Sequence, residues 1–140
     1  MVLFTKEHIP SLIPQRPPIV MIDSVLDATP QTITTALTIL PANILVQDGC
    51  FVEAGLIENI AQTAAAMNGC EAHRRGEQPK LGFIGEVKNF VCHRLPRVGE
   101  TITTSLTTVA AMAGVTLVEA QTTCLNEPIA QAQLKIFIEE

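Results

Sequence analysis

The sequence predicts an α+β domain in which a curled antiparallel sheet is wrapped around one long helix. Three observations lead to this fold class: one long stretch that is apolar on almost all sides, residues 52–68, two strand-like segments before it, and four after it. At 140 residues and 47% hydrophobic, the chain suits a single domain, residues 1–140, with a sizeable core.

The strand segments are rich in β-branched residues or alternate threonine with apolar residues at a period of two. They are residues 19–28, 32–40, 81–92, 100–110, 115–125 and 129–139, with turn residues between them. The proline-rich residues 8–18 predict a short helical turn leading into extended chain, because residues before proline avoid the helical region. Gly82 and Gly85 indicate close backbone packing in a curved strand.

The central helix is predicted over residues 52–68, with Asn68 and Gly69 as its C-terminal stop. Polar residues interrupt it, and from the residues alone we expect a plain solvated stripe, because four of them fall within about 140° of the helical wheel. The alternative is a buried, functional role, because a helix wrapped by a sheet has little surface to give to water. The four polar residues are Glu58, Asn59, Gln62 and Thr63.

Composition and charge exclude several classes of function. The chain has no tryptophan or tyrosine and a formal net charge of -5, which disfavours nucleic-acid binding. The most apolar stretch, residues 51–67, is interrupted by polar side chains, so no membrane span is expected. The first residues hold too short an apolar run for a signal peptide, so we expect a cytoplasmic protein. The four cysteines lack metal-ligand spacing, and we expect reduced thiols, no metal and no cofactor.

Three segments carry a resemblance to a known family. They are IPQRPPIVMIDSVL at residues 13–26, EAGLIENIAQTAAA at residues 53–66, and VKNFVCHRLPRVGETI at residues 87–102. With these segments the chain resembles the 3-hydroxyacyl-acyl carrier protein dehydratases of fatty acid biosynthesis and their relatives in aryl polyene pathways, which have the hot-dog fold. The helix segment is the most specific, because an acidic residue, Glu58, lies four before a glutamine, Gln62.

The resemblance implies lyase chemistry on an acyl thioester. Glu58 would be the catalytic acid, working across a dimer interface with a histidine from the other subunit. The backbone amides of Glu53, Ala54 and Gly55, at the N-terminus of the helix, would bind the substrate by polarising its thioester carbonyl. Gln62 is a further candidate substrate contact, and its alternative role is a structural hydrogen bond to nearby backbone.

The chain departs from the family pattern at the general base. The family carries His-Phe-Pro-Gly shortly before the helix and Pro-Gly at its start, whereas residues 43–55 here contain no histidine and end in Glu-Ala-Gly. Gln15 also stands where a histidine is common. The histidines that are present are expected to be exposed or structural, and the first of them comes closest to a substitute. They are His8, His73 and His93.

Two other residues lie near the place of the missing histidine, Asp48 and Cys50. Cysteine is more often a small apolar filler than a reactive group, and neither residue is assigned a role. The missing base leaves three functions open: a dehydratase-like protein, an acyl thioesterase in which one carboxylate activates water, or a catalytically impaired partner of an active hot-dog dehydratase. The fold alone does not choose between them.

Basic residues gather in one part of the sequence. Six of the nine Lys and Arg residues lie between residues 74 and 97, against two acidic residues there. This predicts docking of an acidic acyl carrier protein or of coenzyme A phosphates, the alternative being a solvated loop and strand edge. The candidates for carrier binding are Arg74, Arg75, Arg94 and Arg97. We also expect a homodimer, or a hetero-oligomer with another hot-dog protein, formed through residues 81–91.

Overall fold

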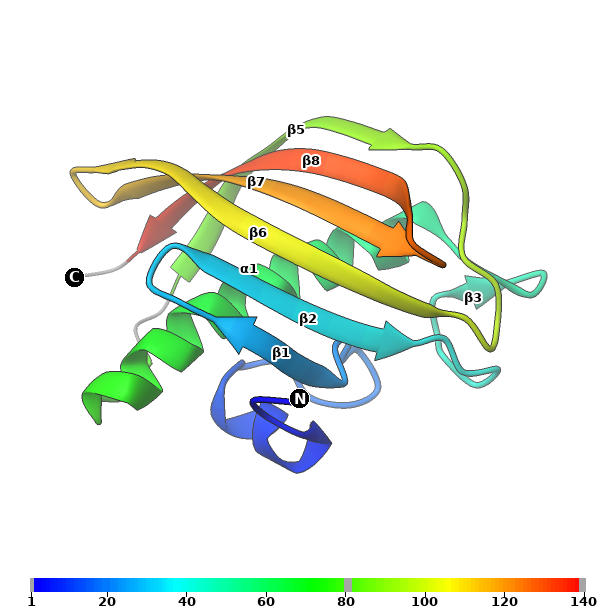
Figure 1. The fold of residues 1–140 in the computed structure, drawn as a ribbon, viewed down its shortest axis with the longest axis horizontal. Coiled ribbons are helices and arrows are strands. Elements are labelled where there is room, and N and C mark those ends of the chain that lie inside the picture. Colours follow the sequence, from blue (N-terminus) through cyan, green and yellow to red (C-terminus); the bar gives the residue numbers. More distant parts are fainter. Residues whose placement is uncertain (1, 80–81, 139–140) are drawn as a thin grey trace.

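The computed structural model describes residues 2–79 and 82–138 and has one long helix inside a curled sheet (Figure 1). The chain begins with a 3-10 helix and two strands: η1 (Lys6–Ser11), β1 (Ser24–Ala28) and β2 (Thr32–Thr38). A small hairpin and the long helix follow: β3 (Val46–Gln47), β4 (Cys50–Phe51) and α1 (Glu53–Arg75). The last four strands are β5 (Gly82–Cys92), β6 (Thr101–Met112), β7 (Val115–Cys124) and β8 (Glu127–Ile138).

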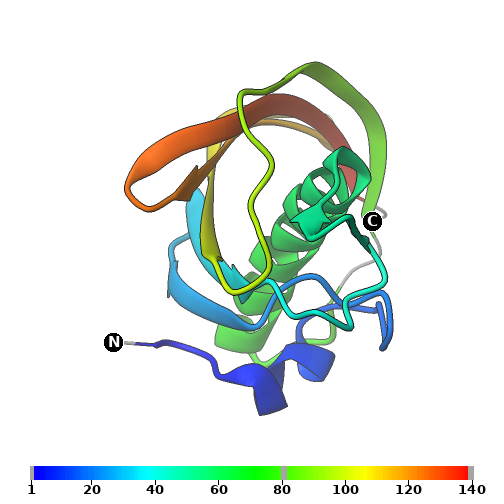
Figure 2. The ribbon, with the colours of Figure 1, turned by 90° about the vertical axis from the view of Figure 1, so that its right-hand side faces the viewer.

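The large sheet has the strand order β1-β2-β6-β7-β8-β5, and every neighbouring pair in it is antiparallel. Figure 2 shows the sheet curling around α1, so the predicted fold class is confirmed. Tight two-residue turns join β6 to β7 and β7 to β8. In the first, Ala113 and Gly114 both have positive φ angles, of 50° and 79°, as such hairpin turns require.

Helix α1 is longer than predicted, and the stop at Asn68 and Gly69 is wrong. It continues to Arg75 and ends at Gly76, which adopts the left-handed conformation with φ of 68°. The buried Gly69 has a different purpose, because a Cβ atom there would lie 2.0 Å from the carbonyl oxygen of Leu12. This glycine therefore lets the segment after η1 cross the helix at very short range.

Strand β1 begins at Ser24, five residues later than predicted. Residues 19–21 are held by α1 instead of by a neighbouring strand. The N–H of Met21 donates to Oε1 of Gln62 at 2.6 Å, and Nε2 of Gln62 donates to the carbonyl of Ile19 at 2.7 Å. The carbonyl of Met21 accepts from Nδ2 of Asn59 at 2.7 Å. This segment therefore satisfies its backbone with helix side chains and has no need of the sheet ladder.

Apolar side chains fill the space between α1 and the sheet in two clusters. One includes Ile60 and Leu106, and the other includes Leu56 and Ile102, closer to the start of α1. The four cysteines are free thiols, as predicted. None of the helices in the described residues combines the length and the apolar character that crossing a membrane requires.

Candidate active site

The start of α1 is positioned by the β3–β4 hairpin. The ring of Phe51, the last residue of that hairpin, is fully buried. It lies so close to Gly55 that a Cβ atom there would come within 2.6 Å of the ring. The glycine of the Glu-Ala-Gly start thus allows the first helical turn to sit directly on a core aromatic ring.

Two backbone donors at this helix start have no backbone acceptor in the part of the chain that the structure describes. The carbonyl of Val52, the N-cap residue, accepts from the N–H of Gly55 at 2.9 Å and from that of Leu56 at 3.1 Å. The backbone N–H of Gly55, which was predicted to bind the thioester carbonyl, is therefore already bonded to the carbonyl of Val52. The N–H groups of Glu53 and Ala54 come earlier than any intrahelical acceptor, and both residues are exposed. These two amides, with the positive end of the helix dipole, suit a carbonyl that gains negative charge.

Glu58 is half-buried and lies beside the open face of α1. That face carries small residues that the sheet does not cover completely: Ala54, Ala61 and Ala65. The solvated-stripe interpretation is wrong, because the three polar residues grouped with Glu58 on the helical wheel are at most 1% exposed. Of that group, Glu58 alone reaches the surface of the single chain.

Gln62 has the structural role that the sequence offered as its alternative. Both ends of its amide are bonded to the backbone of residues 19–21, and the residue is 0% exposed. Its orientation is unambiguous, since an N–H can only donate and a carbonyl can only accept. The proposed substrate contact would have to compete with these two bonds.

An open groove of about 770 Å³ begins one turn beyond Glu58. Its walls come from η1 and the segment after it, from the open face of α1 and the residues that follow this helix, and from two sheet residues, Ile84 and Ile136. Gln15 lines it, and Oε1 of Gln15 is buried without a hydrogen-bond partner within the described chain. Because buried oxygens normally accept a bond, a donor from a ligand or a second subunit would fit this position.

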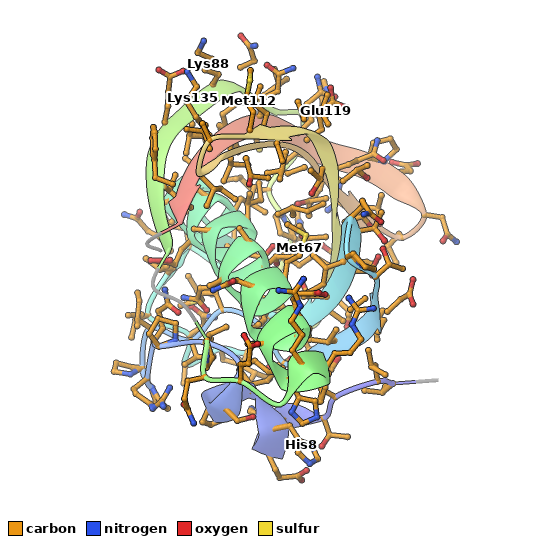
Figure 3. All side chains as sticks on the ribbon, turned by 90° about the vertical axis from the view of Figure 1, so that its left-hand side faces the viewer. His8, Met67, Lys88, Met112, Glu119 and Lys135 are labelled. Carbon is orange, nitrogen blue, oxygen red and sulfur yellow. The ribbon has the colours of Figure 1, made fainter. Side chains whose placement is uncertain are left out.

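Two of the histidines lie at the other end of α1. The rings of His8 and His73 pack edge-on against Phe4, at centroid distances of 6.1 and 5.2 Å. Figure 3 places His8 below the C-terminal end of the helix. Since His73 follows Glu58 by fifteen residues, about 22 Å of helix separate them. His8 is therefore not a substitute base for Glu58 of the same chain.

The remaining histidine, His93, is exposed in the loop after β5. Its backbone N–H donates to the carbonyl of Ile129 at 2.7 Å, while its ring makes no hydrogen bond within residues 2–79 and 82–138. Asp48 is exposed in the β3–β4 turn and Cys50 is half-buried. No histidine of the described chain is thus hydrogen-bonded to Glu58.

Residues 7–140 match the sequence model of a family described as ApeP-like, ApeP dehydratase. The chain belongs to the ApeP-like dehydratase family. The match covers nearly the whole chain, including all three segments that suggested the resemblance. The predicted dehydratase-like protein for acyl thioesters is therefore confirmed. Among curated proteins, none matches the chain in sequence.

Solved structures share the fold at low sequence identity. A chain of the dehydratase heterocomplex ApeI:P from Xenorhabdus doucetiae is 17% identical, with a TM-score of 0.84 over 94% of this chain and 91% of that chain. A hypothetical thioesterase from Streptococcus pneumoniae, solved with coenzyme A, is 9% identical, with a TM-score of 0.67 over 82% and 84%. The PaaI protein of Escherichia coli is 10% identical, with a TM-score of 0.66 over 81% and 80%. These likenesses show the hot-dog fold.

The four candidate arginines for carrier binding form two pairs instead of one patch. Arg74 and Arg75 both pair with Glu71 at the C-terminal end of α1. The other pair lies in the loop after β5, which bonds to the β3–β4 hairpin through the N–H of Phe51 and the carbonyl of Pro96, at 2.8 Å. This loop therefore adjoins the start of α1, roughly 33 Å away along the 23-residue helix. A single patch is wrong for one chain because β5 carries the chain back along the helix.

The loop pair is organised by Glu100. Its Oε1 accepts from the N–H of Arg97 at 2.7 Å and from Nη1 of Arg94 at 3.0 Å. These bonds, that of Arg97 first, lower the pKa of the Glu100 carboxyl. Arg94 is thereby fixed, while the side chain of Arg97 stays exposed. Within the described residues, no three His, Cys, Asp or Glu side chains come together in a way that would hold a metal ion.

Proposed function

We propose that the chain is the subunit without the catalytic histidine in a two-subunit 3-hydroxyacyl thioester dehydratase. Glu58 supplies the acid, and a second hot-dog subunit supplies the histidine base. The observation that carries this proposal is the half-buried Glu58 beside the open helix face, with no histidine of its own chain bonded to it. A carboxylate in that position without a base suits half of an acid–base pair.

The reaction removes a proton from C2 and hydroxide from C3 of the acyl chain. The carboxyl group of Glu58 would protonate the departing oxygen, and the partner's histidine would take the C2 proton. The open N–H groups of Glu53 and Ala54 would bind the thioester carbonyl as it becomes enolate-like. All three residues lie within the first six residues of α1, so one substrate can contact them together.

The partner would add its sheet to the outer edge of β5. This strand ends the sheet on one side and exposes three large apolar side chains, Ile84, Val87 and Val91. An unpaired edge with apolar side chains favours association. The similar ApeI:P structure is a dehydratase heterocomplex, which supports a different hot-dog protein as partner, and so does the missing base. A homodimer remains the competing assembly.

The carrier or coenzyme A would approach the start of α1, where Arg97 is exposed. We expect Arg97→Glu to weaken binding of an acidic carrier protein, with the loss shrinking as salt rises, because exposed charges are screened. Arg74→Glu, at the other end of the helix, is the matched control. Equal affinity for both variants at low salt would remove Arg97 from the carrier site. The expected cytoplasmic location stays a prediction, which cell fractionation would check.

The central test is turnover of a 3-hydroxyacyl thioester by this chain mixed with a histidine-bearing hot-dog protein. We expect the mixture to be active and to elute as one complex. Glu58→Gln should keep the complex but lower its turnover by about a hundredfold to ten-thousandfold, as expected for loss of general acid catalysis. Glu71→Gln changes the same group on the same helix away from the site, and it should keep full turnover.

Three outcomes would contradict the proposal. Hydrolysis of a saturated acyl thioester, lost in Glu58→Gln, would indicate the thioesterase. Full dehydration by the chain alone would show that no partner histidine is needed. Absence of turnover in every mixture would leave only a binding or stabilising role.

A further inference from the structure

A directed chain of hydrogen bonds runs from the sheet through α1 to residue 21. Nδ2 of Asn59 must face the carbonyl of Met21, which can only accept, so Oδ1 of Asn59 accepts from the hydroxyl of Thr104, at 2.6 Å. Thr104 has one proton and uses it on Asn59. The contact of 2.8 Å between Thr104 and Thr122 is therefore donated by Thr122. The order of donation is Thr122, Thr104, Asn59, Met21.

A second, shorter chain lies beside the first. The hydroxyl of Thr63 donates to the carbonyl of Asn59 at 2.7 Å. Its contact of 2.8 Å with Thr35 must then be donated by Thr35. The side chains of both chains are at most 1% exposed, Met21 included. All their hydroxyl protons have acceptors, so the network is complete.

The three sheet threonines form one row across the inner face of the sheet. Thr35 of β2 is opposite Thr104 of β6, which is opposite Thr122 of β7. This row separates the two apolar clusters of the core. Apolar side chains at these three positions would also be buried and would also stabilise the core. The threonine row therefore contributes something further, because its hydrogen bonds fix the orientation of the groups that they join.

Oriented hydrogen bonds matter here because many side chains of α1 are small. Alanines and glycines fix the rotation of a helix weakly, whereas Asn59 bonds to the sheet on one side and to Met21 on the other. Glu58 immediately precedes Asn59. A helix rotation of roughly 10° would move side-chain ends, about 5 to 6 Å from the axis, by about 1 Å. Misplacement on that scale lowers turnover strongly.

We propose that Asn59 and Thr104 are positioning residues that set the rotation of α1 and so aim the Glu58 carboxyl. This inference rests on the proposed function for its kinetic consequence, but not for its structural one. The hydrogen-bond direction makes the two threonines unequal. Loss of the Thr104 hydroxyl leaves Asn59 without its donor, whereas loss of the Thr122 hydroxyl leaves the bond from Thr104 to Asn59 intact.

The test compares Thr104→Val with Thr122→Val and Thr104→Ser in the two-subunit enzyme. Valine keeps the shape of threonine without the hydroxyl, and serine keeps the hydroxyl. At a temperature where all variants are folded, we expect Thr104→Val to lower kcat about tenfold or more with KM within about twofold. Thr122→Val and Thr104→Ser should both stay within about twofold of wild type. Equal losses in the two valine variants would overturn the proposal.

A double-mutant cycle separates positioning from general stability. If Thr104 acts through Glu58, Thr104→Val should add no further loss of kcat in the Glu58→Gln background. Independent, multiplicative losses would contradict it. Should Thr104→Val fail to fold, Thr104→Cys takes its place, because cysteine keeps only a weak donor. Its kcat is expected to fall below that of Thr104→Ser, and a kcat equal to that of the serine variant would count against the proposal.

The structural consequence has its own measurement, which works even if the enzyme is inactive. Crystal structures of the valine variants should show α1 rotated in Thr104→Val and unchanged in Thr122→Val. An unrotated helix in folded Thr104→Val would overturn the positioning role whatever the reaction is. A rotated helix together with an inactive wild-type mixture would instead retain the positioning and reject the proposed dehydration.

Discussion

The inward and open sides of α1 both depart from the pattern expected of an amphipathic helix. The inward side carries three fully buried polar residues, Asn59, Gln62 and Thr63. The open side carries alanines and, beside them, the half-buried carboxyl of Glu58. Polar groups thus lie where water is absent, and small apolar groups lie where a second surface has access.

This difference shows that a polar side chain of α1 is buried where hydrogen-bond partners are available to it. Polarity alone does not decide which side chains are exposed. A buried polar group left without a bond costs about 1 to 3 kcal/mol, but the threonine row and the backbone of residues 19–21 satisfy the inward side chains. The open side has no such partners in the described chain. Its small side chains leave room for another subunit or an acyl chain to lie close to Glu58.

The largest expected effect lies at Gly69, where the segment after η1 packs directly on α1. A Cβ atom there would lie 2.0 Å from the Leu12 carbonyl oxygen, and 2.7 Å from its carbon. We expect Gly69→Ala to lower the free energy of unfolding by about 2 kcal/mol, because the backbone of Leu12 must move. This loss appears even though alanine is the better helix former. Urea unfolding of the single chain measures it.

The matched change is Ala65→Ser, one turn earlier in the same groove, which also adds one heavy atom to α1. Ala65 is only partly covered, so the expected change is within about 0.5 kcal/mol. A loss at residue 65 as large as that at residue 69 would contradict the view that the segment after η1 covers residue 69 and leaves residue 65 open.

The sequence was sufficient for the fold because its signals are local. Alternation in the strands, glycine and asparagine in the turns, and one apolar helical stretch are each readable within a short window. The end of α1 and the start of β1 were not readable in that way. Gly69 is required by its contact with Leu12, and residues 19–21 are held by hydrogen bonds to Gln62. In each case the two partners are more than forty residues apart in sequence.

The candidate site was predictable in part for the same reason. Glu58 stood out as a charge in an apolar helix, and the missing histidine was visible by its absence from the family segment. The positioning row was missed, although a signal existed: Thr35 occupies an inward place in the alternation between Ile33 and Leu37. The four arginines do not form a single patch within one chain, because residues near in sequence are carried by β5 to opposite ends of α1.

The inward side of α1 also carries a titratable thiol, Cys70. It is 8% exposed, and burial raises the pKa of the Cys70 thiol to about 11 from an ordinary value of about 9. As pH rises through this window, the unfolded chain releases the thiol proton while the folded chain retains it, so the free energy of unfolding falls. Cys70→Ala should flatten this decline, although it lowers stability at neutral pH through lost packing. The measurement is the free energy of unfolding in urea as a function of pH, between about pH 8 and pH 11.

The control is Ala66→Gly, which also removes buried volume from α1 but no thiol, and it should keep the wild-type slope. If the free energy of unfolding of Cys70→Ala falls as steeply with pH as that of wild type, titration of the Cys70 thiol does not cause the loss of stability at alkaline pH.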